Sequence, residues 1–262
     1  MKKKFSKYTS LNNHHGTLFN QMETIQKYEF AKKYIQNKAV LDLGCSTGRG
    51  LGLMSECANL VVGLDVNEEA VNIANEQYRG NDKIKLVLGN AEKFSYDIGK
   101  FDTILIYQTI YLLNVDEVIS NVKKILNKNG YVIVMSINPD RADFSPAKYA
   151  VKYHKIDELS ELFRKNGFET KIYGSIHDSQ INYRGKFHSI IRIIKILASL
   201  MSIIPKSYRL KKMLKRVFFG PLKIIPDDAR ELRNIKYIEP KELTDSSLYK
   251  NYISYYLVSK LK

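Results

Sequence analysis

The chain has 262 residues, 44% of them hydrophobic, which is enough to bury a core and argues against a disordered protein. Two cysteines, Cys45 and Cys57, are too few for a disulfide scaffold, and the basic N-terminus lacks the apolar stretch of a secretory signal. The formal net charge of +15 is concentrated at residues 2–7 and 186–223, and the second region carries ten Lys or Arg and no acidic residue. We therefore expect a cytoplasmic protein whose basic character is regional.

Helices and strands are predicted to alternate along the first two thirds of the chain. Apolar residues at helical spacing predict a first helix over 21–37. Further helices are predicted at 49–57, after a cap at Asn67, at 116–126 before a turn at 127–130, and at 157–165 before Gly167. Short apolar runs predict seven strands, at 39–43, 60–64, 84–88, 101–107, 131–137, 168–173 and 252–259.

This alternation predicts an α/β fold with a mostly parallel, seven-stranded sheet and helices on both faces. Residues 174–248, between the sixth and last strands, are basic and are expected to form a largely helical insert. We therefore predict a main domain of residues 1–173 plus 249–262, and an insert that serves as a lid or substrate region.

A glycine-rich turn follows the first predicted strand. That strand ends near Asp42, and Gly44, Gly48 and Gly50 follow closely. Glycine lets the backbone approach a ligand and adopt positive φ angles. Asp65 ends the next strand, 21 residues after Gly44, where an acid can accept hydrogen bonds from ribose hydroxyls. Together these features predict an adenosine-containing cofactor at the carboxyl ends of the strands.

Five segments in order distinguish between such cofactors: VLDLGCSTGRG at 40–50, VVGLDVNEEAV at 61–71, LGNAEKF at 88–94, FDTILIYQTIYLL at 101–113 and LNKNGYVIV at 126–134. With these segments the chain resembles the class I S-adenosylmethionine-dependent methyltransferases over roughly residues 20–175 and 250–260. The resemblance implies a Rossmann-like fold, S-adenosylmethionine as cofactor and S-adenosylhomocysteine as product.

The resemblance also implies roles for single residues. Gly44 and the loop after it would cradle the methionine part and the ribose, Asp65 would hold the ribose hydroxyls, and Val66 would pack on the adenine. Asn90, where relatives usually have Asp, and Ala91 would meet the adenine edge. The implied cofactor-binding residues are Asp42, Gly44, Cys45, Ser46, Gly48, Asp65, Val66, Asn90, Ala91, Glu92 and Tyr107.

Several of these residues have simpler interpretations. Asp42 could only orient the loop backbone, Cys45 could be a small packed residue, and Asn90 could be a turn residue. Ser46 stands where the family often has Gly, which leaves the loop conformation open. Gln108 stands where many relatives have an acid, which weakens a role for it as a base.

Candidate catalytic residues come from two sources. The resemblance places Tyr107 and Gln108 near the sulfonium and the substrate. A hydroxyl acceptor needs a base, and imidazole suits that role near neutral pH. His154 and His14 are the preferred histidines by position, although each could be only a loop or packing residue. No metal site is expected.

The prediction of the acceptor uses segments that lie outside the cofactor motifs. The tracts at 138–174 and 204–222, and the helix at 22–31, are similar to methyltransferases of bacterial surface-polysaccharide clusters. This implies transfer, most readily to oxygen, on a sugar, a nucleotide-linked sugar or a related anionic molecule of capsule biosynthesis. A basic insert near the site would suit an anionic substrate.

Alternatives remain open. Residues 187–204 are apolar apart from Arg192 and Lys195, so with the basic residues up to 223 they could lie on an anionic membrane surface and serve a lipid-linked acceptor at its inner face. We favour instead a helical lid that packs on the domain, or on a second subunit of a homodimer. A nucleic-acid methyltransferase is suggested by charge alone and is disfavoured, because no NPPY-type tetrapeptide or RNA-binding module is present. A protein that keeps the fold without catalysis is disfavoured by the intact cofactor motifs.

Overall fold

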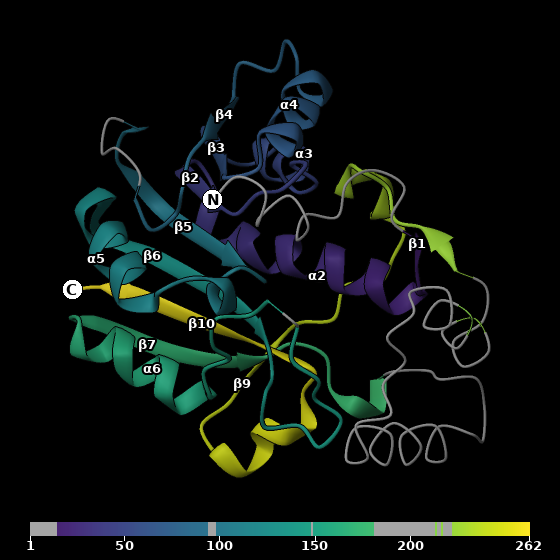
Figure 1. The fold of residues 1–262 in the computed structure, drawn as a ribbon, viewed down its shortest axis with the longest axis vertical. Coiled ribbons are helices and arrows are strands. Elements are labelled where there is room, and N and C mark those ends of the chain that lie inside the picture. Colours follow the sequence, from purple (N-terminus) through teal and green to yellow (C-terminus); the bar gives the residue numbers. More distant parts are fainter. Residues whose placement is uncertain (1–14, 94–97, 148, 181–212, 214–215, 217–221) are drawn as a thin grey trace.

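An eight-stranded sheet forms the centre of the protein, shown by a computed structural model that describes residues 15–93, 98–147, 149–180, 213, 216 and 222–262. Its strands are β2 (Ala39–Leu43), β3 (Leu60–Asp65), β4 (Ile84–Leu88), β5 (Phe101–Tyr107), β6 (Leu126–Ile137), β7 (Phe168–Gly174), β9 (Lys241–Glu242) and β10 (Ser254–Leu261). They lie in the order β4-β3-β2-β5-β6-β10-β7-β9 (Figure 1). The Rossmann-like order places β2 and β5, with their loops, side by side in the middle.

The predicted mostly parallel sheet is confirmed. Strands β2 to β6 pair in parallel, and β10 runs antiparallel between β6 and β7. The predicted count of seven strands is wrong, because the two residues of β9 add an eighth strand antiparallel to β7. A two-residue edge strand has no alternating pattern that a sequence could reveal. A separate small sheet pairs β1 (His15–Gly16) with β8 (Lys223–Ile224).

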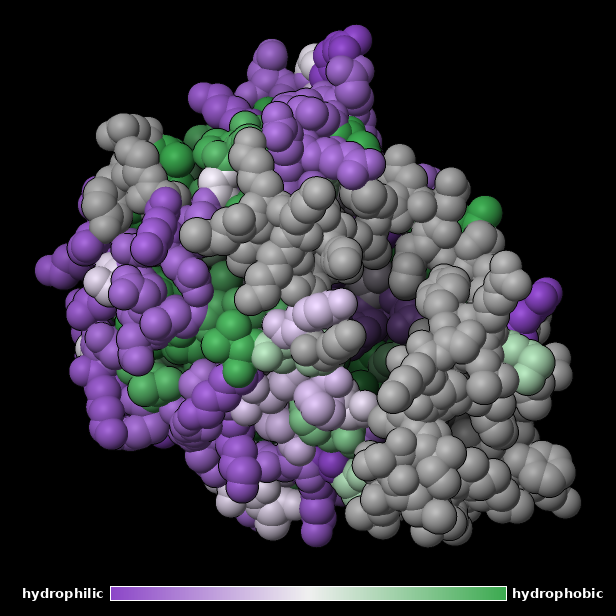
Figure 2. All heavy atoms as spheres, in the orientation of Figure 1, coloured by the Kyte–Doolittle hydropathy of each residue, from purple (hydrophilic) through white to green (hydrophobic). Residues whose placement is uncertain are grey.

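Helices cover both faces of the sheet, as predicted. They are α2 (Leu18–Ile35), α3 (Leu51–Ser55), α4 (Glu68–Gln77), α5 (Val115–Ile125) and α6 (Ile156–Lys165), with 3-10 segments η2 (Ile110–Leu112), η3 (Asp178–Gln180), η5 (Ala229–Leu232) and η6 (Ser246–Asn251). Helices α2 and α3 pack on one face, and α5 and α6 on the other (Figure 1). Hydrophilic residues cover most of the described surface seen in Figure 2.

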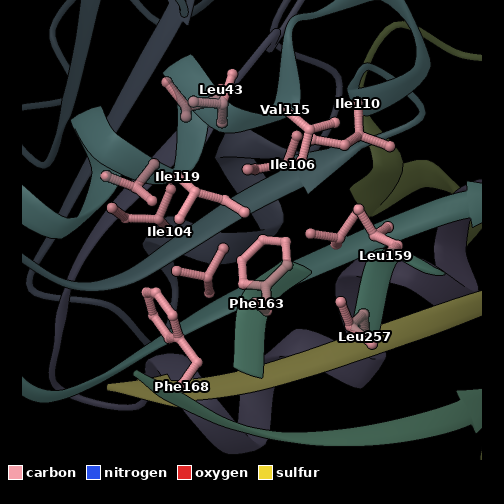
Figure 3. Packing of buried hydrophobic residues seen from close by; sticks show 14 of the residues in the cluster. Leu43, Ile104, Ile106, Ile110, Val115, Ile119, Leu159, Phe163, Phe168 and Leu257 are labelled. Carbon is pink, nitrogen blue, oxygen red and sulfur yellow. The ribbon is translucent and has the colours of Figure 1, made fainter. Parts of the chain in front are cut away.

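The alternation of side chains along β2 explains the two layers. Val40 packs with α2 and α3, whereas Leu41 and Leu43 pack with α5 and α6. Figure 3 shows the second layer, in which Ile119 of α5 and Phe163 of α6 lie against the sheet. All five side chains are fully buried, and each contributes about 1.5–3 kcal/mol relative to an exposed position.

Local signals place most element ends correctly. The Asn67 side chain accepts a hydrogen bond from the Glu69 N–H and caps α4, and Gly167 follows α6 at φ +88°. The predicted turn at 127–130 is wrong in one respect, since β6 already begins at Leu126, which pairs with Phe101. The register shifts there and Asn129 is left-handed, so the expected turn is an irregular extension of the strand.

The described part of the predicted insert packs on the main domain. Ile225, Ala229 and Leu232 are buried, and η5 contacts α2 and α3. The predicted membrane-surface helix at 187–204 lies outside the described residues. Among the helices that are described, none is long and apolar enough to span a membrane.

Candidate functional site

A cleft of about 250 Å³ lies at the carboxyl ends of β2, β3 and β5. Every predicted cofactor residue except Gly48 lines it. Gly48 instead supports the loop from behind: its φ is +76°, and its carbonyl accepts a hydrogen bond from the Tyr78 hydroxyl at 2.8 Å. The structure therefore brings together residues that are widely separated along the chain, at the sheet edge where α/β folds bind ligands.

Gly44 and Ser46 shape the turn that begins the cleft. Gly44 has φ +83°, and a Cβ atom there would lie 2.4 Å from Thr109 Oγ1, so only glycine fits without a shift. Ser46 has φ +54°, a left-handed conformation that glycine adopts more easily. Ser46 thus holds a backbone conformation in this loop that suits glycine better.

Asp65 joins this loop to the start of α4. Its Oδ2 atom accepts the Ser46 backbone N–H at 2.8 Å, and its Oδ1 atom accepts the Asn67 N–H at 2.9 Å. Burial raises the pKa of the carboxyl, while these backbone N–H groups lower it. Each oxygen has a second lone pair, so the carboxylate can hold ribose hydroxyls and the loop at once.

The predicted adenine side of the cleft is formed by the ends of β3 and β4. Val66 is 39% exposed, an unusually open position for an apolar side chain that adjoins a cleft. The Asn90 side-chain oxygen accepts the Glu92 N–H at 2.9 Å, so Asn90 does form a turn. The Glu92 carboxylate accepts the Asn114 N–H at 2.6 Å and thereby ties this turn to α5. Asn90 still offers its amide nitrogen to an adenine edge.

A group of charged residues lines the opposite wall, and only Asp42 was predicted among them. Lys27 of α2 and Arg49 both line the cleft beside Asp42. Burial raises the pKa of Asp42 to about 7, against the lowering effect of Lys27. Burial lowers the pKa of Lys27, which the charges of Asp42 and Glu23 counteract. The wall therefore holds both signs of charge in a poorly hydrated setting.

Arg49 has unused capacity to bind an anion. Its Nε atom donates to the Pro226 carbonyl at 2.8 Å, and its Nη2 atom lies 3.6 Å from Asp227 Oδ1. Among the described residues that buried Nη2 atom has no hydrogen-bond partner. This Nη2 atom forms only a long ion pair with Asp227, which makes it a candidate to contact a bound anion as well.

These features fit S-adenosylmethionine. Arg49 and Lys27 would hold the carboxylate of the methionine part, and Asp42 would face its positive groups. Asp65 would hold the ribose, and Val66 would lie on the adenine. The cofactor supplies a methyl group on a positively charged sulfur, so an ionised acid beside it stabilises the bound state.

Tyr107, the last residue of β5, and Gln108, which follows it, both line the cleft. The Tyr107 hydroxyl is buried and has no partner among the described residues, and burial raises its pKa well above the usual range. Tyr107 therefore stays protonated and can donate a hydrogen bond but not act as a base. Gln108 is left-handed, with φ +53°, and its N–H donates to the Met135 carbonyl at 2.8 Å.

Glu23 of α2 is an acid that sequence reasoning did not single out, and it is not among the residues that line the cleft. Gln108 and Ser254 interact with its carboxyl and stabilise the ionised form, whereas burial acts more strongly and raises its pKa. The available signal was the run of polar residues on the buried side of α2, among them Gln26, which is 2% exposed. A helix that buries polar groups has a reason other than core packing to do so.

Of the two predicted histidines, only His154 is among the described residues, and it does not line the cleft. His154 is mostly buried outside it, where its Nδ1 atom lies 3.2 Å from the Glu158 carboxylate. His14 lies outside the described residues. Cys45 is buried, and burial raises the pKa of its thiol well above the usual range, which keeps the reactive thiolate scarce. Within the described ranges, no group of three acidic, His or Cys side chains could hold a metal.

Comparisons with known proteins agree with this geometry. A family described as "Methyltransferase domain" matches residues 35–216, more than half of the chain. A probable S-adenosylmethionine-dependent methyltransferase of Mycolicibacterium smegmatis is 27% identical over 50% of this chain and 52% of that protein. The matched part thus spans about half the length of that relative.

Two further proteins are similar to this chain, one in sequence and one in fold. The ubiquinone biosynthesis O-methyltransferase of Pelagibacter ubique is 25% identical over 62% of this chain and 79% of that protein. A SAM-dependent methyltransferase of Thermotoga maritima, titled a possible histamine N-methyltransferase, has a similar fold, with a TM-score of 0.56, 16% identity and coverage of 94% and 92%. The fold, the cofactor cleft and the family match lead to one conclusion: the chain belongs to the class I S-adenosylmethionine-dependent methyltransferases.

Proposed function

We propose that the protein transfers the methyl group to an oxygen of a small acceptor, a sugar or nucleotide-linked sugar of the kind used in capsule and other surface polysaccharides. The wall at the end of β5 carries this proposal. Gln108 and Tyr111 line it, and the Tyr111 ring stacks on Tyr153 with centroids 4.5 Å apart and planes at 18°. An amide beside stacked rings suits a small acceptor that has hydroxyl groups and a flat face.

The order of the strands supports separate places for the two substrates. The residues for the adenosine part follow β3 and β4, and those for the methionine part follow β2. Strands β5, β6 and β10 lie on the other side of β2. An acceptor that enters above β5 would therefore meet the methyl group from the side opposite to the adenosine.

The residues of the chain would act by alignment. Arg49 and Lys27 hold the methionine part, and the loop at Gly44 sets its depth in the cleft. Gln108 and Tyr111 orient the acceptor, so that its oxygen meets the methyl carbon in line with the breaking bond. An O-methyltransferase among the relatives supports oxygen as the accepting atom.

A donor-consumption assay tests the proposal. The full chain is supplied with S-adenosylmethionine and a panel of nucleotide sugars, phosphorylated sugars, neutral sugars, small amines and short RNA. We expect S-adenosylhomocysteine to form with sugars or nucleotide sugars, and mass spectrometry to locate the methyl group on oxygen. Transfer to RNA or to amines alone would contradict the proposal.

A further inference from the structure

The Tyr153 ring stacks on the Tyr111 ring, and we propose that Tyr153 is a positioning residue that fixes Tyr111 for contact with the acceptor. Tyr111 lines the cleft, whereas Tyr153 does not. Tyr153 belongs to the connecting segment, residues 149–153, which lies between β6 and α6. The inference rests on the proposed place of the acceptor beside Tyr111 and deepens it, because it names a residue outside the cleft lining on which acceptor recognition depends.

The two rings are nearly parallel. Their centroids are 4.5 Å apart and their planes meet at 18°. Tyr153 therefore covers one face of Tyr111, so a molecule in the cleft meets the opposite face, the ring edge or the hydroxyl. Phe144 in turn meets Tyr153 edge-on, with centroids 4.8 Å apart and planes at 77°. Stacked and edge-to-face contacts are favourable geometries for aromatic pairs, so the three rings form one support.

Backbone hydrogen bonds hold the same two tyrosines. The Tyr111 carbonyl accepts the Val151 N–H at 2.8 Å and the Lys152 N–H at 3.2 Å. The Tyr153 hydroxyl accepts the Ala147 N–H at 3.4 Å. Segment η2, which contains Tyr111, is only three residues long, so it has few hydrogen bonds of its own to fix it. The connecting segment therefore supports both the backbone and the ring of Tyr111.

Contacts with α6 and β10 anchor the far end of the connecting segment. The Glu158 carboxylate of α6 pairs with Lys152 and lies 3.2 Å from Nδ1 of His154. The His154 carbonyl accepts the Tyr255 hydroxyl of β10 at 3.4 Å. Burial does not hold the middle of the segment, since Val151 is 68% exposed. Directed contacts thus fix it, and a single substitution can loosen it without opening the core.

The wall to which Tyr111 belongs carries no charged side chain among the described residues. After the end of β5, the cleft is lined by Gln108, Thr109, Tyr111, Leu112 and Leu113. Burial raises the pKa of Tyr111 above its usual range, so its hydroxyl stays neutral. An uncharged wall binds by ring contact and hydrogen bonds, which require the Tyr111 ring to be in place. The part of the acceptor beside Tyr111 should therefore be uncharged, with any phosphate group bound elsewhere.

Two substitutions at Tyr153 and a matched control test this role. Tyr153→Leu removes the ring, and Tyr153→Phe keeps the ring but removes the hydroxyl. Tyr131→Leu is the control, because Tyr131 is also a half-buried tyrosine in a ring pair, with its centroid 5.2 Å from that of Tyr34, and also does not line the cleft. Turnover is measured with the best acceptor of the sugar panel at saturating S-adenosylmethionine, and cofactor binding is measured by calorimetry.

The expected loss lies in acceptor binding. Tyr153→Leu should raise the acceptor KM by about three- to tenfold and leave kcat and the Kd for S-adenosylmethionine unchanged, because the contact is lost equally from substrate and transition state. The rise should persist at high salt, since no ion pair is broken. Tyr153→Phe should keep the wild-type KM, and Tyr131→Leu should lower the melting temperature without changing KM. An unchanged KM in Tyr153→Leu, or an equal rise in Tyr131→Leu, would overturn the assignment.

A double-mutant cycle shows whether Tyr153 acts through Tyr111. Tyr111→Leu should raise KM by itself, and adding Tyr153→Leu should then have no further effect. Full additivity would show that the two residues act independently and would contradict the positioning role. If Tyr153→Leu does not fold, Phe144→Leu takes its place in the cycle, because Phe144 contacts Tyr153. It should raise KM by a smaller factor, and additivity with Tyr111→Leu counts against the role in the same way.

Failure of the proposed function gives a different result. If wild-type protein methylates an amine but no sugar, transfer to a sugar oxygen is wrong, and the same variants assayed with that amine decide the role of Tyr153. If wild-type protein methylates a sugar and Tyr153→Leu has the same KM for it, only the role of Tyr153 is wrong.

Discussion

Asp65 and Ser46 are joined by a hydrogen bond in which the Asp65 carboxylate accepts the Ser46 backbone N–H at 2.8 Å. The left-handed conformation of Ser46 is unfavourable for a residue with a side chain, so the bond acts as a local restraint on the loop. Asp65 therefore has two expected tasks, since it fixes the loop before the cofactor binds and holds the ribose afterwards.

Replacing Asp65 should weaken cofactor binding strongly. A hydrogen bond to a charged group contributes about 1.5–3 kcal/mol, so Asp65→Ala is expected to raise the Kd for S-adenosylmethionine by at least about tenfold. Asp102→Ala is the matched control, because Asp102 also accepts a backbone N–H, that of Ala39 at 3.0 Å, but does not line the cleft. It should lower the melting temperature and leave the Kd unchanged. Equal Kd values for the two variants would contradict the role of Asp65.

Gly44→Ala should damage the site more than the backbone angle alone explains. Gly80 has the same φ, +83°, yet a Cβ atom there would meet nothing within 4 Å. Gly80→Ala should therefore cost only the left-handed penalty, about 1–2 kcal/mol of unfolding free energy. Gly44→Ala adds the clash with Thr109 and should also reduce cofactor affinity. Denaturant unfolding and calorimetry on both variants measure the difference, and equal losses would exclude the clash.

Cofactor affinity should depend on pH through Asp42. Its pKa is raised to about 7 in the free protein, so the carboxyl is largely protonated below that pH. Binding of a cation favours the ionised form, hence affinity should rise with pH up to about 7 and then level off. For folding the sign is opposite: stability should fall as the pH rises from the ordinary pKa of 3.8 to about 7, and above about 7 the loss from the buried charge is complete.

Two comparisons check the assignment to Asp42. S-adenosylhomocysteine lacks the positive sulfur, so its affinity should vary less with pH than that of S-adenosylmethionine. Asp42→Asn should bind the methyl donor more weakly and with a flatter pH dependence in calorimetry. A pH dependence that survives in Asp42→Asn would assign the titration to another group.

Tyr107→Phe should separate binding from stability. Removing this buried hydroxyl, which has no partner among the described residues, is expected to leave the unfolding free energy unchanged or slightly higher. If the hydroxyl bonds the cofactor or acceptor, the variant loses affinity by about tenfold. Tyr256→Phe removes another buried hydroxyl that has no partner in the described part of the chain and does not line the cleft. This control variant should leave the affinities for cofactor and acceptor unchanged. If Tyr107→Phe also leaves both affinities unchanged, the Tyr107 hydroxyl bonds neither the cofactor nor the acceptor.

Local patterns predicted much of the fold and the cofactor side of the site. The strand that holds Asp42, the glycine turn and Asp65 each follow from nearby residues, because a buried parallel strand and its turn are encoded within about ten positions. The charged wall of the cleft depends on distant contacts. Lys27 reaches the cleft only because α2 packs across the sheet, and Arg49 bonds to Pro226 over 177 positions. The placement of these side chains in the cleft therefore could be seen only in the tertiary structure.

The contact between Arg49 and the segment at 226–229 is expected to couple the cofactor loop energetically to a distant part of the chain. The Arg49 carbonyl accepts the Ala229 N–H at 2.8 Å, while its side chain donates to the Pro226 carbonyl. An occupied cleft should slow hydrogen exchange at Ala229. Because linkage is reciprocal, loosening the segment at 226–229 should lower the cofactor affinity by the same factor. Exchange measured with and without S-adenosylhomocysteine reports this coupling directly, and identical rates would show that segment and loop move independently. If exchange at Ala229 does change, the segment that follows the basic region responds to the occupancy of the cofactor cleft, far from the methyl group itself.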